Sequence, residues 1–378
     1  MAIAILTQPD YFLPVYSVQE WTLYDAVNYG ASGFYYQIEI TVGSETRIIK
    51  QLKDENNKAV IDVQTILQSF IESEWTWNPA LVSHNTDICF GYSIVAKSIW
   101  TASSSTSSSV SRKVFNGVDH YNRTWDTSLY EFRADTPGLF LTSYHGPRDM
   151  HINDMFHINF LYGQSNGIDS SVNGMTFTRY NGSDVSTYTY DYPISSTDVS
   201  VYSLTVDASA LPAGFIDSNT TTITVAESTG LSETLTFNLV STDVRYDRYY
   251  RISYIDHLGS TEYQNFDLVP ENTVDISKTS YVNDRTIRIF GTKVDDNYLV
   301  RTNWISCERS EGLKDLWYAP KVGLMPVGKE DYTVGDLGRY PIVINDSTKQ
   351  ILNRHNTNHM INYTLGFTMA EEYSVQQQ

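Results

Sequence analysis

The stretch YRISYIDHLGSTEYQNFDL, Tyr250 to Leu268, carries the pattern that decides the fold of this sequence. It contains two alternating runs joined at HLGS, and one face of each run carries a regular set of side chains: Tyr250, Ile252 and Tyr254 on the first, Gln264, Phe266 and Leu268 on the second. Glycine adopts backbone conformations that other residues resist, so Gly259 suits the loop. We expect a β-hairpin, and we interpret its tyrosines, histidine and carboxylates as scaffold rather than as a reactive site.

Outward from this hairpin, the C-terminal region 245–378 mixes strands with a short helix. The runs RTIRIFGTKV, RYPIVIND and INYTLGFTMAEEYSVQ have the composition of strands. In CERSEGLKDLWYAP, Leu313, Leu316 and Trp317 recur at helical spacing, and Pro320 ends the run. This region is therefore predicted to be α+β.

The region 111–244 shows short apolar runs with almost no helical periodicity. Residues alternate in MFHINFLYG, and turn signals such as Asn181-Gly182 and Pro212-Ala213-Gly214 fall between the runs. Several short strands at this spacing predict a β-sandwich.

The first 110 residues contain two further strand candidates, GFYYQIEITVG and TDICFGYSIVA. Between them, an apolar set at helical spacing predicts an amphipathic helix at about 61–75, capped by Asp62. The serine-rich stretch TASSSTSSS, 101–109, has nothing apolar to pack and predicts a mobile loop or linker near a domain boundary. Together the patterns predict a mainly β protein of consecutive antiparallel β-sandwich-like domains with a few short helices, α+β toward the C-terminus: 1–110, 111–244 and 245–378.

Composition excludes several classes of function. Aromatic residues make up 13% of the chain and 28 residues are Tyr, which suits half-buried pleated surfaces. The net charge of -18 would repel a DNA duplex, so we expect no direct nucleic-acid contact. Cys89 and Cys307 are too few for a disulfide framework or a zinc cluster, and we expect both to be buried small hydrophobes. The N-terminus lacks the basic segment of a signal peptide, and no apolar run reaches the length of a membrane-spanning helix.

The histidines are the first candidates for a metal site. His355 and His359 have the i, i+4 spacing of helical metal ligands, but they lie among asparagines that form helices poorly, so we predict a polar loop. His151 and His157 would face one way on a strand but lie about 20 Å apart, since a strand rises about 3.3 Å per residue. We therefore predict no metal ligands.

Paired carboxylates are the first candidates for catalysis, because glycoside hydrolysis uses two of them. Asp149/Asp154 and Glu308/Glu311 are close in sequence, but 44 acidic residues produce such pairs by chance. A nucleophile elbow and a phosphate-binding glycine loop are both missing. We predict no catalytic and no cofactor-binding residues, no cofactor, and a protein that is not an enzyme.

Aromatic residues are the strongest positive signal. Trp75, Trp77 and Trp317 are candidate anchors for protein contacts. Tyr188, Tyr190 and Tyr192 would form a stripe on one strand face, beside Tyr180. Two alternatives stay open for this stripe: packing on a facing sheet, or binding a sugar or a protein partner.

The order of several motifs resembles virion structural proteins of tailed bacteriophages and prophages of Bacteroidetes-type bacteria. The resemblance covers most of the chain and is carried by these segments: QPDYFLPVYSVQEWTL, VFNGVDHY, LFLTSYHGPRDMHINDMFHINFLYG, YRISYIDHLGSTEYQNFDL and ERSEGLKDLWYAPKVGLM. The chain departs from the family pattern at the hairpin turn, where Ser260 replaces a second glycine. The resemblance implies a tail, neck or fibre component and implies no catalytic residues.

Three functions follow as alternatives. The first is a non-enzymatic structural component of the virion, assembled in the host cytoplasm, whose partners are copies of itself as a homo-oligomer and neighbouring virion proteins. The second is a receptor-binding or glycan-binding module of a phage fibre that recognises host surface glycan. The third is a polysaccharide depolymerase that acts through two carboxylates.

Overall fold

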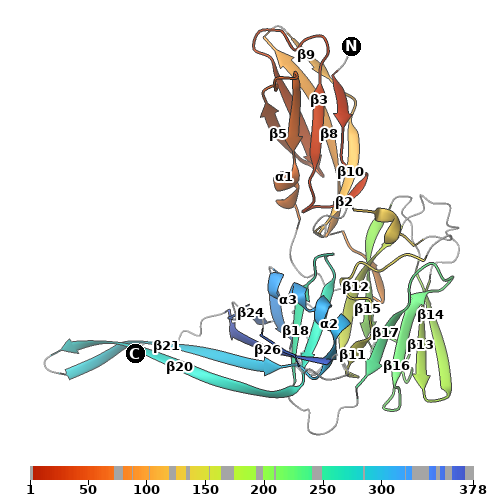
Figure 1. The fold of residues 1–378 in the computed structure, drawn as a ribbon, viewed down its shortest axis with the longest axis vertical. Coiled ribbons are helices and arrows are strands. Elements are labelled where there is room, and N and C mark those ends of the chain that lie inside the picture. Colours follow the sequence, from red (N-terminus) through yellow and green to blue (C-terminus); the bar gives the residue numbers. More distant parts are fainter. Residues whose placement is uncertain are drawn as a thin grey trace.

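The computed structural model contains four sheets, two in an N-terminal lobe and two in a larger body (Figure 1). It describes these residues: 3–71, 80–86, 88–101, 103–118, 125–132, 137–152, 154–162, 174–192, 199–207, 210–240, 249–283, 286–319, 321–325, 340–345, 350–353 and 360–370. The predicted fold class is confirmed, because strands predominate and the described helices are few and short. No helix among these residues is long and apolar enough to cross a membrane.

The N-terminal lobe is a sandwich of two sheets. The first has the order β1-β3-β6: β1 (Ala4–Thr7), β3 (Glu20–Tyr24) and β6 (Lys58–Asp62). The second has the order β2-β10-β8-β4-β5, with β9 paired to β8: β2 (Phe12–Pro14), β10 (Val110–Phe115), β8 (Cys89–Trp100), β4 (Tyr35–Val42), β5 (Glu45–Gln51) and β9 (Ser103–Thr106). Alternation explains the packing: Tyr36, Ile38 and Ile40 of β4 are fully buried in the core between the sheets.

The body contains the other two sheets. The smaller has the order β11-β17-β16-β13-β14: β11 (Arg148–Met150), β17 (Leu235–Leu239), β16 (Thr222–Glu227), β13 (Gly174–Asn181) and β14 (Asp184–Asp191). The larger has the order β20-β21-β26-β24-β23-β18-β19-β12-β15-β7: β20 (Leu268–Asn283), β21 (Thr286–Arg301), β26 (Met360–Met369), β24 (Tyr340–Ile344), β23 (Val322–Met325), β18 (Tyr250–Ile255), β19 (Thr261–Phe266), β12 (Met155–Tyr162), β15 (Ser200–Asp207) and β7 (Val82–His84). Two short strands also pair with β26: β22 (Ile305–Ser306) and β25 (Gln350–Asn353).

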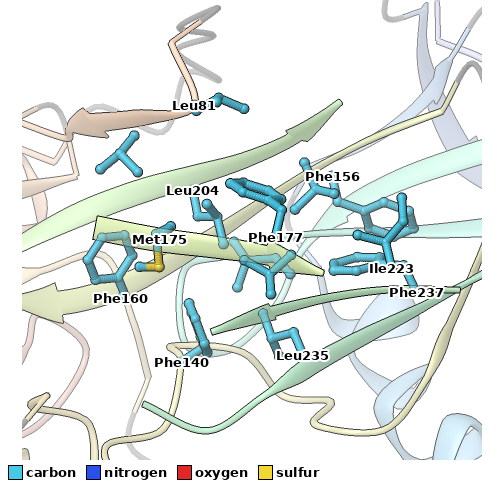
Figure 2. Packing of buried hydrophobic residues seen from close by; sticks show 14 of the residues in the cluster. Leu81, Phe140, Phe156, Phe160, Met175, Phe177, Leu204, Ile223, Leu235 and Phe237 are labelled. Carbon is cyan, nitrogen blue, oxygen red and sulfur yellow. The ribbon is translucent and has the colours of Figure 1, made fainter. Parts of the chain in front are cut away.

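The main core of the body lies between these two sheets (Figure 2). Phe156 and Phe160 of β12 lie in the same buried cluster as Phe177 and Phe237 of the smaller sheet. The rings of Phe156 and Phe237 are 5.1 Å apart. Strand β12 is buried on both faces, because Leu161 belongs to a second cluster that joins the body to the lobe. A strand covered on both sides reads as a nearly continuous apolar run, as the sequence MFHINFLY does.

The described helices are short: α1 (Gln64–Gln68), a 3-10 turn η1 (Thr127–Leu129), α2 (Cys307–Gly312) and α3 (Lys314–Tyr318). The helix predicted at 61–75 is therefore wrong at its start, because Asp62 belongs to strand β6. Asp62 still accepts a hydrogen bond from the backbone N–H of Gln64 at 2.9 Å. After α1, the hydroxyl of Ser69 bonds the carbonyl of Ile66, which competes with continuation of the helix.

The serine-rich stretch differs from its prediction as a mobile loop. Residues Ser103–Thr106 form β9, which pairs with Lys97–Trp100 of β8. The backbone supplies these hydrogen bonds, so the segment needs no apolar side chain to join the sheet. The hydroxyl of Ser107 also accepts a bond from the backbone N–H of Ala96 at 3.0 Å.

Strand pairing also crosses both predicted domain boundaries. Strand β10, which runs across the boundary at 110, pairs with β8 of the lobe, whereas β7, before that boundary, pairs with β15 of the body. Across the boundary at 244, β12 pairs with β19 at His157 and Thr261. The middle and C-terminal regions therefore share one sheet.

Strands β20 and β21 form a long hairpin that projects from the body (Figure 1). Each strand has 16 residues. The sequence identified the second strand but not the first. Alternation of apolar and polar residues in TVDIS, 273–277, is a local signal for this strand.

Candidate functional site

The β18–β19 hairpin is the richest concentration of charged groups in the interior of the body. The hairpin predicted from the sequence is present, and its register runs from Tyr250 opposite Phe266 to Ile255 opposite Thr261. Arg251, Asp256 and Glu262 are all buried. Charged groups leave water only when partners satisfy them, so each must be paired inside the protein.

Glu262 lies between two arginines from different parts of the chain. Its Oε1 accepts from Nη2 of Arg148 at 2.7 Å, and its Oε2 lies 3.5 Å from Nη1 of Arg309. The hydroxyl of Thr142 also donates to Oε1. Burial alone would raise the pKa of Glu262, but the two guanidinium groups hold it below its ordinary value.

The two arginines also share an aromatic partner. The guanidinium carbons of Arg148 and Arg309 lie 5.2 and 4.7 Å from the ring centroid of Tyr144. Arg309 donates further bonds to the carbonyl of Tyr263 at 2.6 Å and to Oε1 of Gln264 at 3.1 Å. Through Arg309, helix α2 is therefore bonded to strand β19 and packs against Tyr144 of the 142–148 segment.

A second ionic cluster surrounds Asp154. Its Oδ2 accepts from Nη1 of Arg251 and its Oδ1 from the hydroxyl of Tyr249, both at 2.8 Å. Asn265 and the backbone N–H of His151 donate to Oδ2 at 2.9 Å. With its oxygens engaged in this way, Asp154 acts as a structural carboxylate, and the pairing with Asp149 considered from the sequence finds no support.

The hairpin turn is held by a third carboxylate. Asp256 Oδ1 accepts from the backbone N–H groups of Leu258 at 3.0 Å and Ser260 at 2.8 Å, and Oδ2 accepts from Ser143 at 2.7 Å. Burial and the charge of Glu262 raise the pKa of Asp256 to about 7 despite these donors. The turn is therefore tied both to itself and to the 140–148 segment.

The same turn contacts the N-terminal lobe. Gly259 has φ +82°, and a Cβ at this position would lie 1.8 Å from the carbonyl oxygen of Asn116. The N–H of Val118 donates to the carbonyl of His257 at 2.6 Å. Ser260 uses its hydroxyl to donate a hydrogen bond to the carbonyl of Leu141. A glycine lacks this donor.

Helix α3 reaches the turn through an imidazole–carboxylate pair. Nδ1 of His257 lies 2.7 Å from Oδ2 of Asp315, and the backbone N–H of His257 donates to the same oxygen at 3.2 Å. Burial lowers the pKa of His257, but Asp315 and Asp256 outweigh burial and raise it above its ordinary value. Hydrogen bonds and charge from His257 lower the pKa of Asp315 against the effect of its burial.

An apolar cluster completes the junction between lobe and body. It combines Phe12 and Phe115 from the lobe with Leu161 and Val201 from the body, and Leu258 from the hairpin turn. The rings of Phe12 and Phe115 stack at 5.1 Å. A continuous buried core of this kind packs the described parts of the lobe and the body against each other.

The histidine candidates do not form a metal site in the described part of the chain. His151 is buried against the ring of Tyr249, with Nε2 3.5 Å from Asp267, whereas Nδ1 of His157 lies 3.0 Å from the hydroxyl of Thr205. Among the described residues, no group of three or more His, Cys, Asp or Glu side chains is arranged to hold a metal ion. His355 and His359 lie outside the described residues.

The remaining acidic and sulfur candidates lie at the surface or in the core without a common site. Glu308 and Glu311 of α2 are both exposed, and Glu311 is paired with Lys314. Cys89 is buried as expected, but the expectation that Cys307 is buried is wrong. Cys307 is exposed and is the first residue of α2.

The tyrosine stripe packs inside the molecule. Tyr188 and Tyr190 of β14 lie against the main core of the body, and Tyr192 is buried in it. The Tyr188 and Phe215 rings are 6.1 Å apart. Of the two alternatives left open by the sequence, these contacts favour packing on a facing sheet.

The tryptophan candidates contribute no exposed anchor within the described residues. Trp317 is half-buried and its ring lies 5.5 Å from that of Tyr363. Trp75 and Trp77 lie outside the described residues. The buried ionic clusters were not predicted from the sequence. The signal that could have indicated them is the presence of charged residues within apolar runs, such as Arg251 and Glu262 in the 250–268 stretch.

Fold and contacts define a mainly β protein of packed sheets, joined by buried ionic clusters and carrying one projecting hairpin. No protein-family model matches the sequence, and no curated protein matches it. The matching solved structures include the chicken CNTN1 FN1–FN3 domains, at 10% sequence identity and a TM-score of 0.16, covering 61% of this chain and 68% of that chain. A likeness at this TM-score carries no argument about the fold or function of this chain.

Proposed function

We propose that this chain is a non-enzymatic structural component of a tailed-phage virion, in the tail, neck or fibre, that works through contacts with other virion proteins and with copies of itself. The observation that carries the proposal is the projecting β20–β21 hairpin (Figure 1). A long two-stranded ribbon is only marginally stable by itself. Contact with another subunit would stabilise it, so a projection of this kind suits a subunit of an assembly better than a protein that acts alone.

The interior of the protein supports the same proposal. The buried carboxylates of Asp154, Asp256 and Glu262 all bind neighbouring parts of the chain. These contacts connect the β18–β19 hairpin to α2, to the 142–148 segment and to Asp154 beside β12, so these parts of the body keep a fixed relative geometry. A subunit that must present several surfaces at once benefits from this rigidity.

The resemblance of the sequence to phage structural proteins supports a location in the virion. The net charge of -18 is compatible with a subunit that stays soluble in the host cytoplasm until assembly. In this proposal, neither nucleic acid nor a membrane is a direct partner. The inward packing of the tyrosine stripe removes the main sequence argument for a glycan-binding surface.

The experiment is to locate the chain in purified particles. A phage that carries the gene is grown, particles are purified on a density gradient, and the chain is quantified by mass spectrometry against the major capsid protein. Cryo-electron microscopy then places it in the density. We expect a fixed copy number per particle and density at the tail, neck or fibre.

A phage with the gene disrupted is the matched control, and we expect it to yield particles that lack the corresponding part. Absence of the chain from intact wild-type particles would refute the proposal. Binding of the purified chain to host glycans on an array, or shortening of host polysaccharide on incubation, would favour the second or third alternative instead.

A further inference from the structure

Asparagine followed by glycine is a reactive pair, and the structure places two such pairs in opposite environments. They are Asn116–Gly117 and Asn181–Gly182, and each follows an aromatic residue, Phe115 or Tyr180. In such a pair the backbone nitrogen of the glycine can attack the side-chain amide of the asparagine. Glycine favours this approach because it has no side chain in the way and its backbone adopts more conformations than that of other residues. The two pairs have similar neighbours, so the fold decides which of them reacts.

The Asn181–Gly182 pair lies at the tip of the β13–β14 hairpin. Asn181 is the last residue of β13 and lies opposite Asp184, so Gly182 and Ser183 form the turn. Gly182 is exposed and has φ +57°, and apart from its neighbours in the chain no atom lies within 4 Å of where its Cβ would be. Strand β14 is the outer strand of the smaller sheet, at the rim of the body (Figure 1). The tip therefore has access to water and room to move.

The Asn116–Gly117 pair lies in the junction between lobe and body. Asn116 is 7% exposed and Gly117 is buried. The N–H of Asn116 donates to the carbonyl of Ile88 at 2.7 Å, and the carbonyl of Gly117 accepts from the N–H of Tyr16 at 3.1 Å. The carbonyl of Asn116 lies against the turn at Gly259. The backbone cannot rotate here unless the junction opens.

From this contrast we infer that Asn181 is a site of spontaneous deamidation in the folded protein and that Asn116 is protected. The backbone nitrogen of Gly182 attacks Cγ of Asn181 and loses its proton. The bond between Cγ and Nδ2 breaks, and the side-chain nitrogen leaves as ammonia. Water, the only co-reactant, then opens the cyclic imide at one of its two carbonyl groups. The product is aspartate or isoaspartate at position 181.

The difference in rate follows from how much structure each reaction must open. Asn181 has to leave the extended conformation of a strand, but only the end pair with Asp184 opens with it. Terminal parts of a structure open at a free energy far below that of global unfolding. Reaction at Asn116 requires a larger unit to open, since its backbone is bonded and packed on several sides. We expect Asn181 to react at least about 10-fold faster than Asn116 in the folded protein.

Both products disturb the end of the hairpin. A carboxylate at position 181 would lie opposite that of Asp184, and like charges directly opposite each other destabilise a strand pair. Arg179 on the same strand already pairs with Asp184 at 2.8 Å and with Asp217 at 3.3 Å. Isoaspartate also adds a carbon atom to the backbone, which interrupts the alternation of the strand. The tip should open, whereas Phe177 farther along β13 stays in the core.

The test follows both asparagines in one sample of the full-length protein. The folded protein is incubated at about 37 °C and about pH 8 in water that carries a heavy oxygen isotope, and peptides are identified by mass spectrometry over time. The isotope enters the product only during the incubation, so deamidation during digestion is recognised. A parallel sample is unfolded in urea. There we expect Asn116 and Asn181 to react at similar rates, because the fold no longer distinguishes them.

Two variants complete the test. Asn181→Gln is the matched control, because glutamine would have to form a larger ring that closes much more slowly, and it should remove the product at 181 without changing the rate at Asn116. Asn181→Asp reproduces the charge of one product. We expect faster amide hydrogen exchange in this variant at the β13–β14 tip and unchanged exchange around Phe177.

Equal rates at Asn181 and Asn116 in the folded protein would overturn the inference. So would the absence of product at Asn181 over a period in which the unfolded chain is converted. Unchanged hydrogen exchange in Asn181→Asp would refute the effect on the hairpin. None of these outcomes bears on whether the chain is present in virions, so the proposed function is tested separately.

Discussion

Replacing Glu262 by glutamine tests whether the buried ionic cluster holds the body together. Coulomb's law at an effective dielectric constant of about 20 gives an attraction of about 6 kcal/mol for the 2.7 Å contact with Arg148 and about 5 kcal/mol for the 3.5 Å contact with Arg309. Glutamine removes this attraction together with the cost of burying the carboxylate. The two guanidinium groups, at most 9% exposed, then lack a counter-charge. Removing one partner of a buried pair typically costs about 3–5 kcal/mol.

The assay is equilibrium unfolding in urea, followed by the fluorescence of the aromatic residues. With a slope of about 3 kcal/mol per molar urea, the expected loss lowers the urea midpoint of the body's unfolding transition by about 1–1.7 M. Glu45→Gln is the matched control, because Glu45 pairs with Arg47 at 2.9 Å but both side chains are more than half exposed. Exposed pairs of this kind contribute about 0–1 kcal/mol.

A second variant tests the mechanism as well as the magnitude. Adding Arg309→Gln to Glu262→Gln removes one of the two uncompensated positive charges. The double variant should therefore be less destabilised than the sum of the two single variants. A Glu262→Gln midpoint equal to that of wild type, or strict additivity of the two changes, would refute this account of the cluster.

Three further outcomes follow from the turn and from the cysteines. Gly259→Ala should speed proteolysis at the lobe–body junction about 10-fold more than Gly214→Ala, because both glycines have positive φ but only Gly259 would place a Cβ against backbone. The neighbouring carboxylates raise the pKa of His257 in the folded protein despite its burial. The protonated imidazole therefore stabilises the folded state fully below the ordinary pKa of 6.5, and this stabilisation is lost as the pH rises through the raised pKa. The free energy of unfolding should then fall more between pH 6 and 8 in wild type than in His257→Gln, and equal pH slopes would contradict this reasoning. In timed alkylation with mass spectrometry, Cys307 should react well before Cys89, because Cys307 is exposed and burial raises the pKa of the Cys89 thiol, and equal rates would contradict it.

Periodicity in the sequence was sufficient for much of the local structure. The alternation in Tyr35–Val42 and in the two runs around Gly259 correctly predicts β4 and the β18–β19 hairpin. Local alternation predicts a strand because side chains on a pleated backbone face opposite sides at each step, independent of what covers them. The mainly β class and the positive φ of Gly259 follow from the same local rules.

The candidate site was predictable only as a set of residue types. The pattern of residues 250–268 predicts two strands and shows that this stretch contains Arg251, Asp256 and Glu262. The partners of Glu262, Arg148 and Arg309, lie far away in the sequence. An ion pair between distant residues has no local periodicity, so inspection of one region cannot find it. The sequence correctly predicted the 250–268 stretch to be a hairpin, and the structure shows how its charges serve that scaffold.

The sequence by itself determined which segments are extended and how acidic and aromatic the chain is, because strand alternation and composition are properties of neighbouring residues. Only the tertiary structure decided that Ser103–Thr106 joins a sheet and that β7 crosses to the body. It also decided that the tyrosines of β14 pack inward. Each of these outcomes depends on which strand edge or sheet face lies opposite. Backbone hydrogen bonds and burial are satisfied by partners that are remote along the chain and close only after folding.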